Sequence, residues 1–224
     1  MENLTLVIPA KKEKESLPTV LGELQKYNLK KLIVLEKDDV ETINSIDDDY
    51  SELIFQTNSG YGDAIRLGIE KVQTKFFCIF NADGSFNPSE LKNMMNLISE
   101  KNADLVFASR YESDCGSEDD TYVTRLGNFI FTKIGNIFFD LNITDILYTY
   151  VIGNTEMVKK LNLKNNDFSL CVELPIKAKK NNYKLITSKS FERIRISGKK
   201  KVNAIKDGFI ILIQMFKLFF YKVK

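Results

Sequence analysis

The segment Phe76-Phe-Cys-Ile-Phe80-Asn-Ala-Asp83-Gly-Ser85 passes from five apolar residues directly into a polar turn. A short apolar run that ends in Asn, Asp and Gly is typical of a buried strand followed by a loop. In open α/β sheets, ligands bind beyond the carboxyl ends of the strands. The segment therefore predicts an α/β fold and a polar site where this strand ends.

Similar apolar runs lie on both sides of this segment, and helical patterns separate them. Further strands are predicted at Leu4–Ile8, Leu32–Leu35, Leu53–Phe55 and Leu105–Ala108, and helices at Ser16–Leu24, Asp63–Val72 and Leu91–Ser99. The last helix follows Asn87-Pro-Ser-Glu90, which combines a capping residue, a proline at the first helical position and a glutamate three residues after the cap. This alternation predicts a mostly parallel, doubly wound α/β sheet with helices on both faces.

Polar residues follow several of the predicted strands. They are Pro9–Pro18 with Glu13 and Glu15, Glu36, Asn81–Ser85, and Ser109-Arg110-Tyr111. We expect the acidic groups to hold a divalent cation and the hydroxyls of a nucleotide sugar, with Arg110 facing phosphates. Each group also has a purely structural explanation, as a turn or as charges at a helix N-terminus. Their joint placement at the sheet ends favours the binding site.

Some chemistry is excluded by composition. The chain has no histidine, so a general base must be a carboxylate, lysine, tyrosine or cysteine. Cys78, Cys115 and Cys171 are far apart and form no CxxC pair, which predicts neither a disulfide framework nor a zinc site and favours a reducing, cytosolic environment. The opening MENLTLVIPA lacks the basic region of a signal peptide, so secretion by that route is not expected.

Charge is unevenly distributed over the 224 residues, a length that fits one globular domain with an appended tail. Residues 1–174 hold 18 Lys/Arg and 28 Asp/Glu, whereas residues 175–224 hold 14 and 2. The basic end is therefore expected to meet an anionic partner, either a phosphate-rich ligand, nucleic acid or a membrane surface. Nucleic acid is disfavoured, because residues 1–174 would repel a polyanion and no nucleic-acid-binding motif is present.

Two apolar segments bear on a membrane partner. The apolar run Phe209–Phe216, flanked by lysines, is much shorter than the ~20 residues of a spanning helix, and its broad apolar face suits an interfacial helix. Docking onto its own domain or onto a second subunit is the alternative, so a homo-oligomer stays open. We expect a domain at 1–202 and the amphipathic helix at 203–224. Apolar residues at helical spacing from Leu126 to Phe138 fit either core packing or membrane contact.

Taken in order, the motifs resemble the family 2 glycosyltransferases with the GT-A fold, in the subgroup of dolichol-phosphate mannosyltransferase and bacterial polyprenyl-phosphate sugar transferases. The resemblance covers roughly residues 3 to 205. It rests on Leu6-Val-Ile-Pro-Ala10 with Glu13 and Glu15, Asn58–Ile69, Phe80–Pro88, Asp104–Tyr111, Arg125-Leu-Gly-Asn128, Thr144-Asp145, Glu173 and Arg195–Lys201.

This resemblance implies an inverting transfer of a hexose from a nucleotide diphosphate-sugar, of GDP-mannose or UDP-glucose type, to a polyprenyl or dolichyl phosphate. The reaction would take place at the cytosolic face of a membrane. A phosphate acceptor is already anionic near neutral pH, which fits the absence of a histidine base. A glycan acceptor and a non-catalytic homologue that binds nucleotide sugars are the alternatives.

The resemblance also assigns roles to individual residues. Asp83 would ligate Mg²⁺ or Mn²⁺, assisted by Asn81 or Ser85, and Asp145 and Glu173 would join it as catalytic residues lining the acceptor side. Substrate binding would involve Pro9, Ala10, Glu13, Glu36, Gly60, Gly62, Arg66, Asn81, Ala82, Arg110, Arg125, Arg195 and Lys201. A cation and guanidinium groups near a diphosphate stabilise the charge that gathers on this leaving group.

The chain departs from the family pattern at three places. Asn81 stands where the family has the first aspartate of an Asp-x-Asp motif, and an amide brings no charge to a metal. Lys11-Lys12 replaces an aromatic-Asn pair near the base, so the sequence does not identify the base or the sugar. Tyr148-Thr-Tyr150 stands near the place of a Gly-Phe pair.

Overall fold

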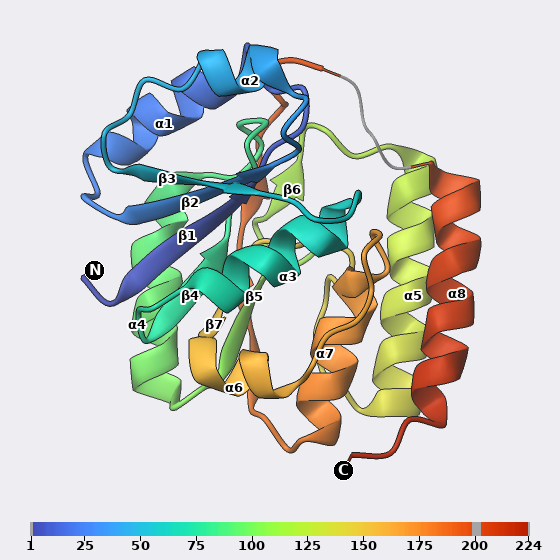
Figure 1. Cartoon of the computed structure of the whole chain (residues 1–224). Helices are drawn as coiled ribbons and strands as arrows, with labels where there is room; N and C mark the ends of the chain where they lie inside the picture. Colours follow the sequence, from blue (N-terminus) through green and yellow to red (C-terminus); the bar gives the residue numbers. More distant parts are fainter. Residues whose placement is uncertain (1, 199–202, 224) are drawn as a thin grey trace.

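A seven-stranded sheet forms the centre of the computed structural model, which describes residues 2–198 and 203–223 (Figure 1). The order is β3-β2-β1-β4-β7-β5-β8, and only β7 runs antiparallel to its neighbours. The strands are β1 (Leu4–Pro9), β2 (Lys30–Leu35), β3 (Ser51–Phe55), β4 (Phe76–Ile79), β5 (Leu105–Ser109), β7 (Val151–Asn154) and β8 (Leu185–Lys189). The predicted mostly parallel α/β sheet is confirmed.

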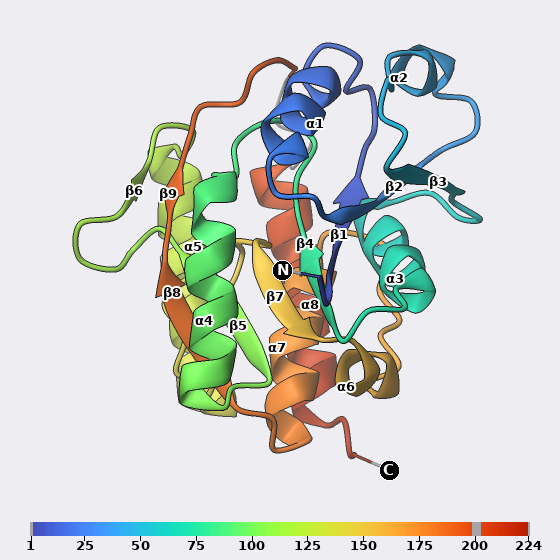
Figure 2. The ribbon, with the colours of Figure 1, turned by 90° about the vertical axis from the view of Figure 1, so that its left-hand side faces the viewer.

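Helices cover both faces of this sheet, because alternate residues of each strand point to opposite sides. Leu4, Leu6 and Ile8 of β1 pack with α1 (Leu17–Gln25) and α4 (Leu91–Lys101). Val7 packs on the other face, which is covered by the remaining long helices (Figure 2). These are α3 (Tyr61–Lys71), α5 (Tyr122–Phe139), α7 (Leu170–Lys180) and α8 (Ala204–Phe219), and the short α6 (Thr155–Lys160) lies nearby. The short α2 (Val40–Asn44) follows β2.

The antiparallel strand β7 is the main departure from the predicted series. It inserts between β4 and β5, and Gly153 allows the close packing there, because a Cβ atom at this position would lie 2.9 Å from the Phe77 ring and 3.2 Å from the Leu105 side chain. With only four residues, Val151–Asn154 carries too little pattern to reveal its direction from sequence.

The helix start at Asn87 is confirmed in part. The Asn87 side chain accepts from the backbone N–H of Ser89, and Pro88–Glu90 forms one 3₁₀ turn before α4. Glu90, however, does not reach back to Asn87. Its carboxylate accepts from Ser190 and from the backbone of Phe191, so it joins this turn to β9 (Phe191–Glu192), which pairs with the short β6 (Gly116–Ser117). A long-range contact thus replaces the local one.

The C-terminal helix α8 packs against α5 and α7 through Ile211, Met215 and Leu218. The outer sides of α5 and α8, which lie side by side, remain exposed and apolar. We call this surface the α5/α8 face; it comprises Tyr122, Val123, Leu126, Phe129, Ile130, Ile137, Phe138, Ile205, Phe209, Leu212, Ile213, Phe216 and Phe219. Core packing is therefore wrong for most of the apolar positions between Leu126 and Phe138. No helix in the described part of the chain is long and apolar enough to span a membrane.

Candidate functional site

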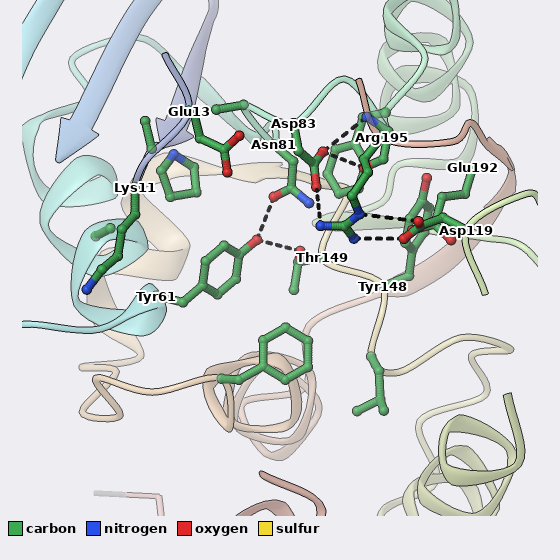
Figure 3. Close-up of a pocket in the computed structure, with 18 of the residues that line it drawn as sticks. Lys11, Glu13, Tyr61, Asn81, Asp83, Asp119, Tyr148, Thr149, Glu192 and Arg195 are labelled. Atoms are coloured by element: carbon green, nitrogen blue, oxygen red, sulfur yellow. Dashed lines mark hydrogen bonds and ion pairs between the residues drawn. The ribbon is translucent and has the colours of Figure 1, made fainter. Parts of the chain in front are cut away.

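A cavity of about 650 Å³ opens at the carboxyl ends of β1, β4 and β5. The loops after these strands contribute Pro9–Glu13, Asn81–Ser85 and Arg110 to its wall, as expected for a ligand site in an α/β sheet. Ten of the predicted site residues line this cavity (Figure 3). They are Pro9, Ala10, Glu13, Gly60, Asn81, Ala82, Asp83, Ser85, Arg110 and Arg195.

The Asp83 carboxylate is oriented by its own turn and by a cation. Its Oδ1 accepts from the backbone N–H of Ser85 at 3.0 Å and from the Ser85 hydroxyl at 2.7 Å, and its Oδ2 lies 3.7 Å from a guanidinium nitrogen of Arg195. Ser85 is buried, and its hydroxyl donates this hydrogen bond to Asp83. The hydroxyl therefore positions the carboxylate in this structure.

Asn81 points its amide oxygen away from Asp83. The Tyr61 hydroxyl donates to that oxygen at 2.8 Å and lies 2.6 Å from the hydroxyl of Thr149. Burial raises the pKa of Tyr61, so the phenol stays protonated and remains a donor. The amide nitrogen points toward Asp83 in Figure 3. The oxygen that was expected to assist a metal thus accepts a hydrogen bond from Tyr61 in this structure.

A segment after β9 crosses over the Asp83 turn. The backbone N–H groups of Arg193 and Ile196 donate to the carbonyls of Ser85 and Asp83, both at 2.9 Å. Arg195, held by Asp119 at 2.7 and 3.2 Å, is thereby kept beside Asp83. Its hydrogen bond to Asp119 raises the pKa of Arg195, so the guanidinium stays protonated.

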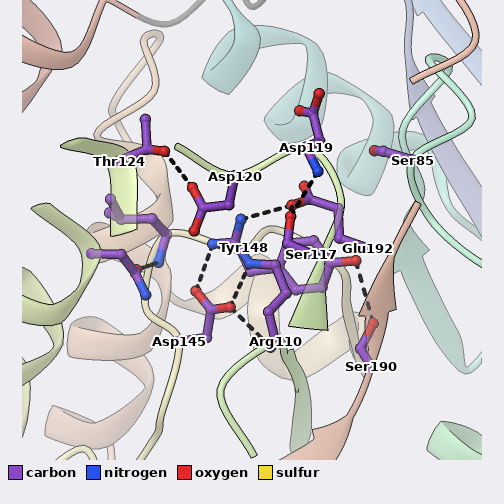
Figure 4. Close-up of polar contacts among 12 residues, drawn as sticks. Ser85, Arg110, Ser117, Asp119, Asp120, Thr124, Asp145, Tyr148, Ser190 and Glu192 are labelled. Carbon is purple, nitrogen blue, oxygen red and sulfur yellow. Dashed lines mark hydrogen bonds and ion pairs between the residues drawn. The ribbon is translucent and has the colours of Figure 1, made fainter. Parts of the chain in front are cut away.

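Arg110 is enclosed by carboxylates (Figure 4). Asp145 accepts from its Nε at 2.7 Å and its Nη2 at 3.0 Å, and Glu192 accepts from its Nη1 at 3.0 Å. Burial alone would lower the pKa of Arg110, but the charges of Asp145 and Glu192 raise it well above its ordinary value. The expectation that Asp145 lines the acceptor side is wrong, because its side chain is fully buried beneath Arg110.

Glu173 likewise lies outside the cavity. It is 1% exposed on α7, accepts from the backbone N–H groups of Lys164 and Asn165 at 2.8 to 3.0 Å, and pairs with Lys177 at 2.7 Å. The expectation of an acceptor-side carboxylate is therefore corrected. Glu173 fixes a loop, residues 164–168, whose last two members, Asp167 and Phe168, line the cavity.

Gly62 and Arg66 secure the same loop from α3. A Cβ atom on Gly62 would lie within 3 Å of the loop backbone, and Arg66 donates to the carbonyl of Lys164 and to the side chain of Asn166. Neither residue lines the cavity. Their positions fit a structural contact better than the substrate contact that was expected of them.

Three further predicted residues lie away from the cavity or outside the structure. Glu36 pairs with Lys11 at 3.0 Å and lines an adjoining pocket of about 540 Å³ with Lys12 and Asp39. Arg125 is exposed on α5, and its guanidinium lies over the Tyr111 ring. Lys201 falls outside the described residues.

The cavity wall also holds residues that sequence reasoning did not select. They are Lys11, Lys12, Gln56, Tyr61, Ala64, Phe86, Asp119, Asp120, Thr124, Asn128, Leu147, Tyr148, Thr149, Asp167, Phe168, Glu192 and Asp207. Asp119 and Asp120 stand in a loop rich in Ser, Asp and Glu that reads as an ordinary turn. Asn128 and Tyr148 belong to the segments Arg125-Leu-Gly-Asn128 and Tyr148-Thr-Tyr150, which are the sequence features that point to them.

Carboxylates outnumber cations on this wall. It carries seven, Glu13, Asp83, Asp119, Asp120, Asp167, Glu192 and Asp207, against four cations, Lys11, Lys12, Arg110 and Arg195. An anionic ligand would meet net negative charge here, so a bound divalent cation would strengthen the binding of such a ligand. Within residues 2–198 and 203–223, no three acidic, cysteine or histidine side chains converge as a metal cage. The donor set of Asp83 therefore fits a cation shared with phosphate oxygens, the arrangement that Mg²⁺ commonly adopts.

The family model described as "Glycosyl transferase family 2" matches residues 5–162. An uncharacterized glycosyltransferase of Mycobacterium tuberculosis strain H37Rv is 25% identical over 220 residues, which cover 98% of this chain and 97% of that protein. An uncharacterized protein of Methanocaldococcus jannaschii is 24% identical over 191 residues, 82% of this chain and 79% of that protein.

Among solved structures, the fold is similar to that of glucosyl-3-phosphoglycerate synthase from Mycobacterium tuberculosis in complex with Mn²⁺, UDP and phosphoglyceric acid. The TM-score is 0.74 at 11% identity, and the match covers 100% of this chain and 80% of that chain. At this identity the likeness concerns the fold alone.

Proposed function

The chain belongs to glycosyl transferase family 2 and is a glycosyltransferase, and from this premise we propose that it moves a hexose from a nucleotide diphosphate-sugar to a polyprenyl phosphate at a membrane surface. The observation that carries this proposal is the position of the cavity. It reaches from the carboxyl ends of the strands to α5 and to Asp207 of α8, the two helices that bear the exposed apolar face.

For the donor, we propose that the loop after β1 receives the nucleotide and that the Asp83 turn receives the diphosphate. Pro9–Glu13 and the Asp83 turn line one cavity, and the pocket of Glu36 adjoins it. Asp83 is the residue that would hold Mg²⁺ or Mn²⁺. A divalent cation supplies positive charge to the leaving diphosphate. The synthase with the similar fold was solved with Mn²⁺ and UDP, which supports a donor of this class.

Arg195 and Arg110 have different roles in this proposal. Arg195 lies 3.7 Å from Asp83, so it is the guanidinium nearest to where the diphosphate would sit. Arg110 donates three hydrogen bonds to Asp145 and Glu192, and we propose that it stiffens the wall and keeps Glu192 in place. A preorganised guanidinium such as that of Arg195 stabilises a transition state in which negative charge develops on the leaving group.

The composition of the helices that form the α5/α8 face supports a position at a lipid surface. The two helices carry four basic residues, Arg125, Lys133, Lys206 and Lys217, and one acidic residue, Asp207, which lines the cavity. Aromatic and aliphatic side chains with lysines beside them suit the interface of an anionic leaflet. In this proposal, α8 is the interfacial helix of the C-terminal segment 203–224, and residues 1–202 form the catalytic domain.

A hydroxyl acceptor is the second candidate, and Asp120 is the observation that favours it. This carboxylate lines the cavity near α5 and accepts hydrogen bonds from Tyr111 and Thr124. A sugar or lipid hydroxyl needs a general base, whereas an ionised phosphate does not. The net negative wall also disfavours a second anion beside the diphosphate.

Turnover with defined acceptors tests the proposal. Purified protein is incubated with a panel of UDP- and GDP-sugars, Mn²⁺ or Mg²⁺, and farnesyl phosphate, or octyl glucoside as the hydroxyl acceptor. We expect release of nucleotide diphosphate that requires both metal and farnesyl phosphate, with the glycosyl phosphate identified by mass spectrometry. Release with octyl glucoside alone would favour the second candidate, and donor binding without any release would indicate a non-catalytic homologue.

Membrane binding is expected to depend on the α5/α8 face. Phe209 and Phe216 are 63% and 68% exposed, and burying a phenyl side chain contributes about 1.5–3 kcal/mol. Changing either residue to glutamate should weaken binding to phosphatidylglycerol-containing vesicles by about ten-fold or more in a co-sedimentation assay. Binding should also fall as salt rises.

Tyr50 provides the matched control, because it is 74% exposed and lies outside α5 and α8. Tyr50→Glu should leave vesicle binding unchanged. If Phe209→Glu and Phe216→Glu bind vesicles like the unaltered protein, the face does not meet lipid. A change from dimer to monomer in light scattering would instead assign the face to a second copy.

A further inference from the structure

Three polar side chains form a ladder along one face of α5. Asn128, Thr132 and Asn136 are four residues apart, so they lie above one another on the helix. Each accepts a backbone N–H from the segment that precedes β7: Asn128 from Leu147 at 3.0 Å, Thr132 from Ile146 at 3.2 Å and Asn136 from Ile143 at 3.2 Å. The ladder therefore joins α5 to residues 143–147.

Asn128 differs from Asn136 in what its amide nitrogen does. The Nδ2 of Asn136 donates to the carbonyl of Ile143 at 2.9 Å, so both ends of that amide are paired. The Nδ2 of Asn128 is buried and has no hydrogen-bond partner among the described residues. Its orientation is fixed, because the oxygen must face the N–H of Leu147. An unpaired buried donor is unusual in a folded protein.

The ladder contact alone does not require an asparagine at this position. Thr132 makes the same kind of contact with a hydroxyl, so an oxygen that accepts the backbone N–H is all that the ladder needs. Asn128 is 1% exposed and forms part of the cavity wall, as do Thr124, one turn earlier on α5, and Leu147. The residue that carries the extra donor thus belongs to the wall of the cavity, on the side formed by α5.

We propose that Asn128 binds the acceptor, with its Nδ2 donating a hydrogen bond to an oxygen of the acceptor head group. This inference rests on the proposed function, because it assigns the α5 side of the cavity to the acceptor and the Asp83 side to the donor. The oxygen belongs either to a phosphate or to a sugar hydroxyl. Both lie within reach of a lipid anchored at the adjacent α5/α8 face.

Two substitutions remove the amide Nδ2 while keeping an oxygen that can accept the backbone N–H of Leu147. Asn128→Asp is isosteric, and Asn128→Thr copies the residue at position 132. Calorimetry in the absence of donor measures the affinity of each variant for farnesyl phosphate and for octyl glucoside. We expect both variants to bind the true acceptor about 10- to 100-fold more weakly, while the Kd for nucleotide diphosphate with Mn²⁺ changes less than about two-fold.

The two variants distinguish a phosphate oxygen from a sugar hydroxyl as the group that Asn128 binds. A phosphate would be repelled by the new carboxylate, so Asn128→Asp should lose more affinity for farnesyl phosphate than Asn128→Thr. A hydroxyl can donate to a carboxylate, so Asn128→Asp should lose less affinity for octyl glucoside than Asn128→Thr. Thr132→Val is the control: it removes a ladder contact without touching the donor, and should lower the melting temperature but leave acceptor affinity unchanged.

The inference is overturned if the unaltered protein binds neither probe, or if both Asn128 variants bind the probes as the unaltered protein does. It is also overturned if Thr132→Val weakens acceptor binding equally, because the effect would then come from the ladder. If acceptor binding depends on Asn128 but no nucleotide diphosphate is released, the role of Asn128 is supported and the proposed transfer to this acceptor is contradicted.

Discussion

Asp83→Asn is expected to lower turnover by about 10²- to 10³-fold, the scale of losing one preorganised electrostatic contact to the transition state. Asp83 is the carboxylate of the Asn81–Ser85 turn, and Asn81 is a neutral amide whose oxygen accepts a hydrogen bond from Tyr61. Neutralising Asp83 therefore leaves this turn without a charged ligand for a divalent cation. Titration of Mn²⁺ in the presence of nucleotide diphosphate should show a matching loss of affinity.

The fold should survive this substitution. An asparagine oxygen at position 83 can still accept from the backbone N–H and hydroxyl of Ser85, which hold the turn. Asp49→Asn, at an exposed aspartate outside the cavity wall, provides the control and should leave both turnover and Mn²⁺ affinity unchanged. Full metal-dependent turnover of Asp83→Asn would show that the metal assignment is wrong.

The fold was predictable where the information is local. Apolar runs and helical spacing located β1 to β5 with α1, α3 and α4 to within a few residues, because strand and helix periods are written in consecutive residues. The strand β7 was not predictable in this way. Its four residues owe their direction to the long return path through α5, and to the fit of Gly153 between Phe77 and Leu105.

The site was predictable to the extent that strand order brings chain segments together. Asp83, Arg110 and Pro9 meet because their strands end at one edge of the sheet. Which carboxylate faces a ligand was not predictable, because that depends on pairs between distant residues. Asp145 is occupied by Arg110, 35 positions away, and Glu90 by Ser190, 100 positions away.

The buried pair of Arg110 and Asp145 leads to the largest expected effect on stability. Asp145 is fully buried, and its two oxygens accept from Nε and Nη2 of Arg110 and from the Arg110 backbone N–H. Asp145→Ala leaves a buried guanidinium with Glu192 as its remaining carboxylate partner. Breaking one side of a buried ion pair costs about 3–5 kcal/mol, so the melting temperature should fall by roughly 6–20 °C.

Comparison with an exposed pair makes this prediction specific. Glu36→Ala removes the partner of Lys11, whose side chain is 48% exposed, and should cost less than about 1 kcal/mol, because water screens such pairs. If Asp145→Ala lowered the melting temperature no more than Glu36→Ala does, a structural role for Asp145 would be contradicted. Donor binding of the variant would then show whether Arg110 turns toward phosphates without unfolding the wall. The substitution therefore decides between Arg110 as a fixed part of the wall and Arg110 as a ligand for the substrate.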